Sequence, residues 1–515
     1  MLIQTYKKYL TIPVNIHASI KKLKFYKAGE SEMLFDLDVK IDTISPNFTA
    51  YLDTSIFNGN EIELICDPEM EFSVGTTDIF APESENEPYR PKLHFTVKNG
   101  WNNDPNGLIK HNGVYHMFYQ YNPCCSDWGN MHWGHAISND LLKWKELDVA
   151  LFPDEHGTMY SGCAFEDKKR ISGLGDPDSK DSLVLLYYTA AANNLLSAGK
   201  KFTQCLAVMQ DGKIKKHKGN PIIPHIESSN RDPKVVWVEE LGKYLLALYL
   251  TEKRFIFLVS DDLLNWSELQ TIDLTPDREC PDIYSLECEG EKLWVVSGAN
   301  DYYIVGRFDN GKFAATGSLK RLSVGGMNYA AQSFSGIDDG RAIRIYWQRC
   351  GIPSDKVTQQ MSIPVEMSLS KENGEYYLSA LPVRELDAYR HEVASVSALG
   401  ANPEIKIPLS NAPLDIVLKA PYADGARIKM RIFGNVVTID TASNVIALGR
   451  NKIPLSLSKK NIDVRMIVDR SSIEIFADGG KILFASQFIC DYNLPFISVS
   501  ADKSINLDEF KIYEV

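Results

Sequence analysis

The sequence predicts an all-β protein, in which a five-bladed β-propeller is preceded by a small N-terminal β-module and followed by a C-terminal β-sandwich. Three observations support this prediction. Short apolar runs separated by turn residues extend along the whole chain, one strand pattern recurs five times in its middle, and the pattern changes near residue 373. A chain of 515 residues is also too long for one hydrophobic core. We therefore divide it into residues 1–88, 89–372 and 373–515.

The N-terminal module is predicted from short runs in which apolar and polar residues alternate. Residues 22–26 and 61–65 show this alternation, and the Asn-Gly-Asn stretch at 58–60 supplies a turn. Such alternation is typical of strands with one buried face, as in a small β-sandwich. The polar, proline-bearing stretch 81–88 then predicts a linker.

The propeller is predicted from a repeated strand. An apolar run preceded by a turn recurs at intervals of roughly fifty to seventy residues, which indicates repeated sheet units. The copies are residues 113–121, 182–190, 242–250, 292–299 and 341–348. A longer match relates residues 138–147 to 260–269, two repeats apart, with Asp140 and Asp262 in equivalent places. Unrelated hairpins in a large sandwich would not predict that match, so we favour the propeller.

The C-terminal part shows a different pattern. Residues 381–389 read as a short connector, and alternating strands with many turns follow to the end of the chain. Residues 461–468 and 472–476 are two such strands, and the Asp-Gly-Gly stretch at 478–480 predicts a hairpin turn. We expect a β-sandwich that packs on the propeller, because this part has no concentration of titratable groups.

Composition and charge exclude some functional classes. The chain has 44% hydrophobic and 24% charged residues, as an ordinary globular protein does. Its net charge of −12 and pI near 5.4 argue against nucleic acid or an anionic membrane as a partner, because phosphate binding needs basic patches. No run of eighteen apolar residues occurs, so we expect no membrane span.

Cysteine usage and the N-terminus suggest a compartment. Nine cysteines without regular spacing do not form a disulfide framework, which favours a reducing environment. The first ten residues lack the apolar core of a signal peptide. We therefore expect a cytoplasmic protein, or a secreted one if the chain begins after a removed signal. The oligomeric state stays open.

Three acidic residues share one local context. Asp104 lies in Trp-Asn-Asn-Asp-Pro-Asn-Gly at 101–107, where Pro105 favours an extended backbone at Asp104 and Gly107 can adopt positive φ. Asp232 directly precedes a proline, and Glu279 stands two residues before one. All three lie at the beginning of predicted strands in different blades.

These carboxylates could meet at one end of the propeller channel, because the inner strands of a propeller converge on one axis. A pair of carboxylates at such a place suits acid/base or covalent chemistry on a sugar. Lone acids before prolines are more often turn residues, as Asp67-Pro68 and Asp176-Pro177 illustrate. Three acids in the same position of different blades favour a functional site over three ordinary turn residues.

Several motifs resemble those of glycoside hydrolase family 32, the invertases, inulinases and levanases. The three acidic motifs are Trp101-Asn-Asn-Asp-Pro-Asn-Gly107, Arg231-Asp-Pro-Lys-Val235 and Glu279-Cys-Pro-Asp282. Further similar blocks lie at residues 118–123, 132–136, 160–162 and 468–476. The resemblance covers roughly residues 89–515 and implies a five-bladed propeller with a C-terminal sandwich. Residues 1–88 lie outside this common core, although similar N-terminal modules occur in some bacterial members.

The resemblance also implies roles for individual residues. Asp104 would be the nucleophile, Glu279 the acid/base, and Asp232 the acid that holds the fructosyl hydroxyls. Arg231 would keep Asp232 ionised. The residues implied in sugar binding are Asn103, Gln120, Trp128, Ser161, Arg231 and Trp347.

The sequence departs from the family pattern beside the acidic motifs. Arg278 stands where many members have an aromatic residue, and Cys163 replaces a serine of the block at 160–162. Cys280 matches the family, and it could be a small buried filler or a reactive thiol. His132 and His135 would point to opposite faces of a strand, so we expect no metal site and no cofactor.

Four functions follow from these residues. The first is a retaining β-fructosidase that hydrolyses terminal β-D-fructofuranosyl linkages of sucrose, fructo-oligosaccharides or fructans such as inulin and levan. The same site could instead transfer fructose to another sugar. A non-catalytic sugar-binding propeller and an inverting arabinan-type hydrolase are further alternatives, and the later motif blocks argue against the last. In every case the partner is a neutral sugar, which suits the acidic surface.

Overall fold

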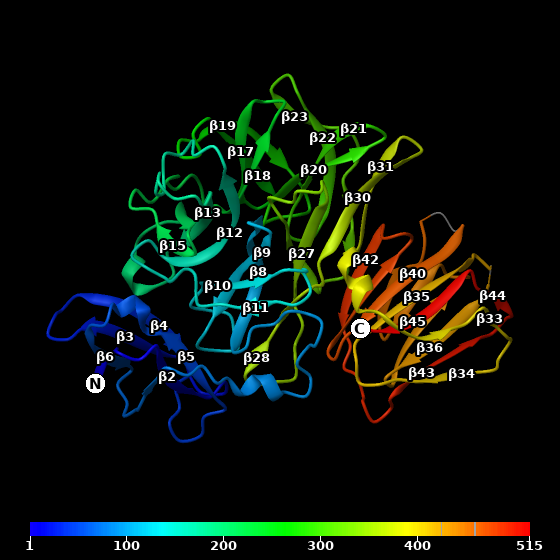
Figure 1. Cartoon of the computed structure of the whole chain (residues 1–515), viewed down its shortest axis with the longest axis horizontal. Coiled ribbons are helices and arrows are strands. Elements are labelled where there is room, and N and C mark those ends of the chain that lie inside the picture. The colour runs from blue at the N-terminus through cyan, green and yellow to red at the C-terminus, as the bar shows by residue number, and fades with distance from the viewer. Residues whose placement is uncertain (424, 458–459) are drawn as a thin grey trace.

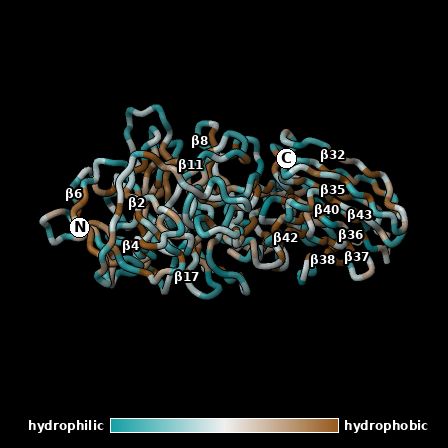
Figure 2. Tube along the Cα trace, turned by 90° about the horizontal axis from the view of Figure 1, so that it is seen from below, coloured by the Kyte–Doolittle hydropathy of each residue, from teal (hydrophilic) through white to brown (hydrophobic). Residues whose placement is uncertain are grey.

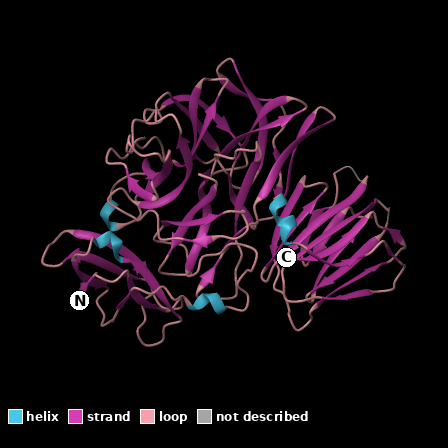
Figure 3. Cartoon of the chain, in the orientation of Figure 1, coloured by secondary structure: helices cyan, strands magenta, loops and turns pink. Residues whose placement is uncertain are grey.

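The computed structural model describes residues 1–423, 425–457 and 460–515, and it is built almost entirely of β-strands (Figures 1 and 3). Three parts follow one another from the N-terminus to the C-terminus (Figure 1). The helices of the described residues are short 3₁₀ turns: η1 (Thr54–Phe57), η2 (Glu83–Asn86), η3 (Leu195–Ser197) and η4 (Arg384–Tyr389). None of the described helices has the length and apolar character needed to span a membrane.

The N-terminal part consists of two small sheets that enclose one core. The first sheet contains β1 (Leu2–Gln4), β6 (Glu61–Asp67), β3 (Lys21–Lys27) and β4 (Met33–Val39), and the second contains β5 (Phe48–Asp53), β2 (Tyr9–Val14) and β7 (Gly75–Thr77). Residues of β2 and β6 are alternately buried and more exposed, as the sequence predicts. Cys124, from the middle part of the chain, packs into this core, so the module is attached to its neighbour.

The middle part is a succession of antiparallel sheets. The first sheet contains β8 (Gly100–His111), β9 (Val114–Asn122), β10 (His132–Ser138) and β11 (Lys145–Glu146), with β28 (Val357–Thr358) beside β8; the second contains β12 (Thr158–Asp167), β13 (Leu183–Ala191), β14 (Thr203–Gln210) and β15 (Lys213–Lys216). The third contains β16 (Arg231–Val238), β17 (Lys243–Thr251), β18 (Arg254–Ser260) and β19 (Ser267–Asp273); the fourth contains β20 (Asp282–Cys288), β21 (Glu291–Ser297), β22 (Tyr302–Asp309) and β23 (Lys312–Ala315), with β24 (Lys320–Arg321). The fifth contains β26 (Asn328–Ser333), β27 (Ala342–Gln348), β30 (Val365–Glu372) and β31 (Glu375–Pro382), with β29 (Gln360–Met361).

The recurring apolar runs are the second strands of these sheets, namely β9, β13, β17, β21 and β27. The first strands β8, β12, β16, β20 and β26 contact one another in that order, and β26 also contacts β8. The sheets are therefore arranged around a common centre (Figure 1). The boundary drawn after residue 372 falls in the turn between β30 and β31, so the last sheet extends beyond it to Pro382.

The repeated ten-residue segment is a turn with the same hydrogen bonds in both copies. Asp140 accepts the backbone N–H groups of Leu142 and Lys143, and it follows β10. Asp262 accepts the two equivalent N–H groups after β18, the third strand of its own sheet. The repeat thus marks the same corner of two sheets, because an aspartate is needed there to cap the turn.

The C-terminal part is a β-sandwich. One sheet contains β25 (Ser323–Val324), β42 (Ile482–Gln487), β41 (Ser472–Ala477), β40 (Asn461–Val468), β35 (Leu414–Pro421), β45 (Glu509–Glu514) and β32 (His391–Ser395). The other contains β34 (Ile405–Pro408), β43 (Phe496–Ala501), β36 (Arg427–Ile432), β37 (Asn435–Asp440), β38 (Val445–Leu448) and β39 (Asn451–Pro454). The short strands β33 (Ala398–Leu399) and β44 (Ile505–Asn506) form a separate pair. The core between the sheets is aliphatic, and Figure 2 shows hydrophobic stretches along these strands. Ile467, Phe476 and Leu483 instead join the core of the middle part, as predicted for a sandwich that packs on it.

A buried ion pair fastens the start of the middle part to the sandwich. Asp469 accepts the backbone N–H groups of Lys92, Leu93 and His94, and its Oδ2 lies 3.0 Å from Nδ1 of His94. Burial alone would lower the pKa of His94, but the contacts with Asp469 and Glu474 raise it to about 9. Burial would raise the pKa of Asp469, but His94 and the N–H groups lower it to about 2.

This pair predicts a pH window for stability. The raised pKa of His94 means that its stabilisation is complete below pH 6.5 and is lost as pH rises through about 9. The lowered pKa of Asp469 means that its contribution is present above pH 3.8 and is lost as pH falls through about 2. We therefore expect the melting temperature to decline between pH 6.5 and 9. In the His94→Gln variant this decline should be much smaller. An identical pH dependence in both proteins would contradict the assignment.

Candidate active site

The three acidic residues singled out in the sequence meet in one pocket. Asp104 lies in β8, Asp232 lies in β16, and Glu279 lies just before β20, each on a different sheet. Asp104 and Asp232 are only 9% and 6% exposed. The pocket that all three line has a volume of about 370 Å³. The convergence expected from a shared place on the first strands is therefore present.

Irregular pairing of the first strands brings these side chains to the pocket. In β8 one extra residue lies between the paired positions Asn102 and Pro105, and Asp104 is within this β-bulge. The same one-residue excess occurs around Asp232 in β16, and also in β12 and β26. A bulge bends its strand and redirects side chains, and it is a frequent device beside active sites.

The backbone around the acids is unusual in a second way. Asp232 has φ of 66° and Glu279 has φ of 56°, a left-handed conformation that non-glycine residues seldom adopt. Such conformations cost roughly 1–3 kcal/mol each and persist where the surrounding structure fixes them. The fold thus holds two of the three carboxylates in strained positions.

A chain of hydrogen bonds orients Asp104. The hydroxyl of Ser161 donates to Oδ2 of Asp104 at 2.6 Å, and Nε2 of Gln120 donates to that hydroxyl at 2.6 Å. Nδ2 of Asn103 in turn donates to Oε1 of Gln120 at 3.2 Å. The position of the Asp104 carboxylate is therefore fixed before any ligand arrives.

Cys280 lies between two of the carboxylates. Its Sγ is 3.5 Å from Oδ2 of Asp104 and 3.5 Å from Oδ2 of Asp232, and its backbone N–H donates to Asp232 at 3.0 Å. Burial, together with the negative charge of Asp232 and Asp104, raises the pKa of the thiol well above its ordinary value. Of the two readings left open by the sequence, the reactive thiol is thus disfavoured. Cys280 is a protonated thiol whose single S–H can donate to either carboxylate.

Arg231 is shared between two acids. Its guanidinium donates to Oε1 of Glu279 at 2.9 Å, whereas its Nε lies 3.7 Å from Oδ2 of Asp232. Burial raises the pKa of Asp232 to about 7, and the positive charge of Arg231 offsets this only in part. Desolvation is thus the larger effect at Asp232, and the role of Arg231 in keeping Asp232 ionised stays a prediction.

Crowding of carboxylates also affects Asp104. Burial and the neighbouring charge of Glu279 raise its pKa, against the hydrogen bonds from Ser161 and Asn103. Like charges this close disfavour full ionisation, so this cluster of carboxylates tends to retain a proton, on Asp104 or Asp232, near neutral pH. A pocket of acids that retains a proton can combine a carboxylate nucleophile with a proton donor.

Two unpredicted side chains lie at or near Glu279. The hydroxyl of Tyr329 donates to Oε2 of Glu279 at 2.6 Å, and the guanidinium of Arg349 lies 3.7 Å from the centre of the Tyr329 ring. Neither residue lies in a recognisable motif, because Tyr329 follows an ordinary Gly-Gly-Met-Asn stretch. They lie near Glu279 only in the folded protein.

The predicted sugar-binding residues are placed as follows. The pocket is lined by Asn103, Gln120, Trp128, Arg231 and Trp347, together with the unpredicted Tyr160, Phe202 and Ser229. Ser161 lies in a smaller hollow beneath, with Asp104, Asp232 and Cys280. Trp128 is 52% exposed, so it offers a free aromatic face at the rim. Nε of Arg278 is 3.9 Å from Glu279.

No group of three or more potential ligands capable of holding a metal is found in the part of the chain that the structure describes. His132, one of the two histidines considered for such a role, points its Nδ1 at the backbone oxygen of Asn130. His135 stacks on Phe118, with ring centres 4.1 Å apart. The two histidines thus have separate structural surroundings.

Comparison with known proteins identifies relatives. The family model described as the glycosyl hydrolases family 32 N-terminal domain matches residues 94–380, and the family 32 C-terminal model matches residues 411–514. Levanase of Bacillus subtilis is 32% identical over 79% of this chain and 67% of its own length. Fructan beta-fructosidase of Streptococcus mutans is 29% identical, and the aligned region spans 31% of that longer protein.

A solved structure shares the fold. The crystal structure of exo-inulinase from Aspergillus awamori superposes with a TM-score of 0.74 over 84% of this chain and 99% of that chain, at 23% identity. At this identity the likeness concerns the fold alone. Residues 1–88 lie outside both family models.

Proposed function

The chain belongs to glycoside hydrolase family 32, and from this premise we propose that it is a retaining β-fructosidase of sucrose, fructo-oligosaccharides and fructans. The observation that carries the proposal is that Asp104, Asp232 and Glu279 line one partly buried pocket. The basic residues that line this pocket are arginines. Relatives named levanase and fructan beta-fructosidase support the same substrate class.

The proposed reaction has two displacements. In the first, an oxygen of Asp104 bonds to the anomeric carbon of the fructosyl unit while the glycosidic C–O bond breaks and Glu279 protonates the departing oxygen. In the second, Glu279 takes a proton from water, whose oxygen bonds to the anomeric carbon and releases Asp104. Two inversions at one carbon give net retention.

The neighbouring side chains prepare these steps. The hydrogen bond from Ser161 leaves the second oxygen of Asp104 available for attack. In the ligand-free protein Glu279 accepts from both Arg231 and Tyr329, which holds its carboxyl group towards the pocket. Asp232 is positioned to accept hydrogen bonds from sugar hydroxyls, because carboxylate oxygens are acceptors.

The proposal fixes the stereochemistry of the product. Early-time proton NMR during sucrose hydrolysis should show β-fructofuranose first, before mutarotation mixes the anomers. The same assay run on inulin and levan would rank the substrates. First-formed α-fructofuranose would overturn the double displacement, and release of no fructose from any of the three sugars would overturn the β-fructosidase proposal itself.

The shared proton predicts a pH profile. Because burial raises the pKa of Asp232 to about 7, the cluster loses its retained proton as pH rises through that region. We expect kcat/KM to fall on the alkaline side with an apparent pKa near 7, because the cluster then lacks the proton that the departing oxygen needs. Asp232→Asn removes one negative charge, so the alkaline limb of its residual activity should move to lower pH. An unmoved limb would contradict this coupling.

We further propose that the five sheets of the middle part are the blades of a five-bladed propeller whose centre forms the site. The closed order of contacts among β8, β12, β16, β20 and β26 supports this arrangement. The proposed division into residues 1–88, 89–372 and 373–515 then needs one adjustment, because β31 is paired with β30 and extends the last blade to Pro382.

A further inference from the structure

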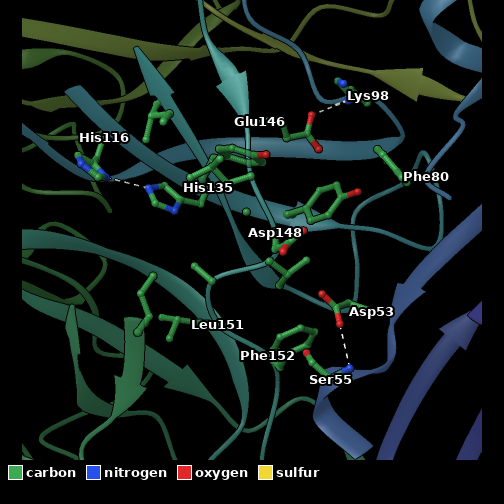
Figure 4. A pocket seen from close by; sticks show the side chains of 18 of the residues that line it. Asp53, Ser55, Phe80, Lys98, His116, His135, Glu146, Asp148, Leu151 and Phe152 are labelled. Carbon is green, nitrogen blue, oxygen red and sulfur yellow. Dashed lines mark hydrogen bonds between the residues drawn. The ribbon is translucent and has the colours of Figure 1, made fainter. Parts of the chain in front are cut away.

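A large cavity lies away from the three carboxylates. It has a volume of about 930 Å³ and is lined by the N-terminal module together with β9, β10 and β11 and the outer strands β14 and β15 (Figure 4). It shares no lining residue with the pocket of Asp104. Its size is within the roughly 300–1,000 Å³ typical of ligand sites, which often lie between domains.

Aromatic rings form one wall of this cavity. Tyr9, Tyr51 and Phe80 pack against one another, with ring centres 5.0–5.9 Å apart. Phe152 contributes a further ring from the segment that follows β11 (Figure 4). All four side chains are half-buried, so parts of their surfaces remain open to a ligand. Flat apolar rings of this kind suit the C–H faces of a sugar.

Polar groups open into the same space. Oε2 of Glu146 accepts the backbone N–H of Lys98 at 2.9 Å, while its Oε1 has no hydrogen-bond partner among the described residues (Figure 4). The side chains of Tyr119 and Tyr121 also line the cavity. Burial raises the pKa of Glu146 to about 7, because the hydrogen bond from Lys98 and the charge of Arg90 offset desolvation only in part. Polar groups that open into a cavity can bind the hydroxyl groups of a ligand.

The charge of the cavity points to a neutral ligand. Three carboxylates of its lining, Asp53, Glu146 and Asp148, are balanced by three lysines, Lys98, Lys145 and Lys216. Two of these charges are already paired, Asp148 with Lys8 and Lys216 with Asp154, each at 2.6 Å. A balanced lining does not select a phosphorylated or carboxylate-bearing ligand, whereas a polyol can donate hydroxyl protons to Glu146 and stack on the rings.

We propose that this cavity is a second sugar-binding site, which takes a neutral fructo-oligosaccharide segment distant from the bond being cut. The proposal rests on the function proposed above, because fructans are the sugars that the chain would meet. Binding a polymer at two places raises its apparent affinity through effective concentration, whereas sucrose gains nothing. The N-terminal module, which lies outside the family models, thereby acquires a role in selecting long substrates.

The experiment counts binding sites. The full chain carrying Asp104→Asn, which prevents turnover, is titrated calorimetrically with the trisaccharide 1-kestose. We expect two binding events per chain, and one when Phe80→Ala or Glu146→Gln is added. The matched control is Ile79→Ala, because Ile79 is 70% exposed beside Phe80 and does not line the cavity. That variant should keep both events.

Kinetics supply a second readout. In the otherwise unaltered chain, Phe80→Ala and Glu146→Gln should raise KM for inulin by about tenfold or more and leave kcat/KM for sucrose unchanged. A single binding event in the parent chain, or two events that survive both substitutions, would overturn the second site. Failure of the proposed function is distinguishable, because the unaltered chain would then release no fructose from sucrose.

Discussion

The Asp104→Asn variant is expected to lose roughly 10⁴-fold or more of kcat on sucrose while its melting temperature stays near that of the unaltered protein. Asparagine has the same shape and can still accept the hydrogen bond from Ser161, so the pocket should remain intact. What it lacks is the negative charge that attacks the anomeric carbon. Steady-state kinetics with sucrose and thermal unfolding of both proteins measure the two parts of this result.

The control uses the same substitution at a place without a site. Asp176 also precedes a proline, but it is exposed and lies in a surface turn. Asp176→Asn should therefore leave kcat unchanged. Turnover near that of the unaltered protein in purified Asp104→Asn would refute the nucleophile assignment, because asparagine cannot supply the attacking carboxylate oxygen.

The second large effect concerns stability. Replacing Arg344 by Leu should lower the free energy of unfolding by about 3–5 kcal/mol, because it removes the buried cation that two buried carboxylates share. Arg344 is 0% exposed, and it donates to Asp282 at 3.1 Å and to Asp301 at 2.9 Å. The pair links β27 of the last sheet to the sheet that begins with β20. Chemical denaturation followed by tryptophan fluorescence would measure the loss.

A surface arginine of the same region provides the comparison. Arg384 pairs with Glu366 at 2.8 Å, but its side chain is 65% exposed and water can replace the contact. Arg384→Leu should leave the denaturation midpoint nearly unchanged. Equal losses in the two variants would mean that burial of the Arg344 charges is not what matters.

Much of the fold could be predicted because local sequence patterns indicate its strands and turns. The recurrent apolar run gave the second strand of each sheet, and the match between residues 138–147 and 260–269 is the same capped turn in two sheets. Asp104 was recognisable because a pre-proline carboxylate in a turn motif is a local feature. The predicted end of the last sheet lies one strand too early, because the turn between β30 and β31 looks like any other turn.

Other parts of the site depend on distant contacts and could not be predicted. Tyr329 reaches Glu279 across fifty positions of the chain, and no periodicity signals that contact. The dominance of desolvation at Asp232 over the charge of Arg231 depends on the depth of the pocket, which no motif records. The cavity of Glu146 is formed by segments from residues 9–80 and 116–216, so it exists only after the N-terminal module has docked.

The β-bulges of the first strands have a consequence for insertions and deletions. Each bulge adds one residue to β8, β12, β16 or β26 relative to its partner strand. Removing that single residue would restore regular pairing with the same partners on both sides and would abolish the local bend, so the side chains at the bulge itself would change direction. Deleting one residue next to Asp104 would therefore leave all three acids in the sequence and yet direct one of them away from the pocket. The proposed reaction therefore depends on the number of residues in these strands as well as on the identity of the three acids.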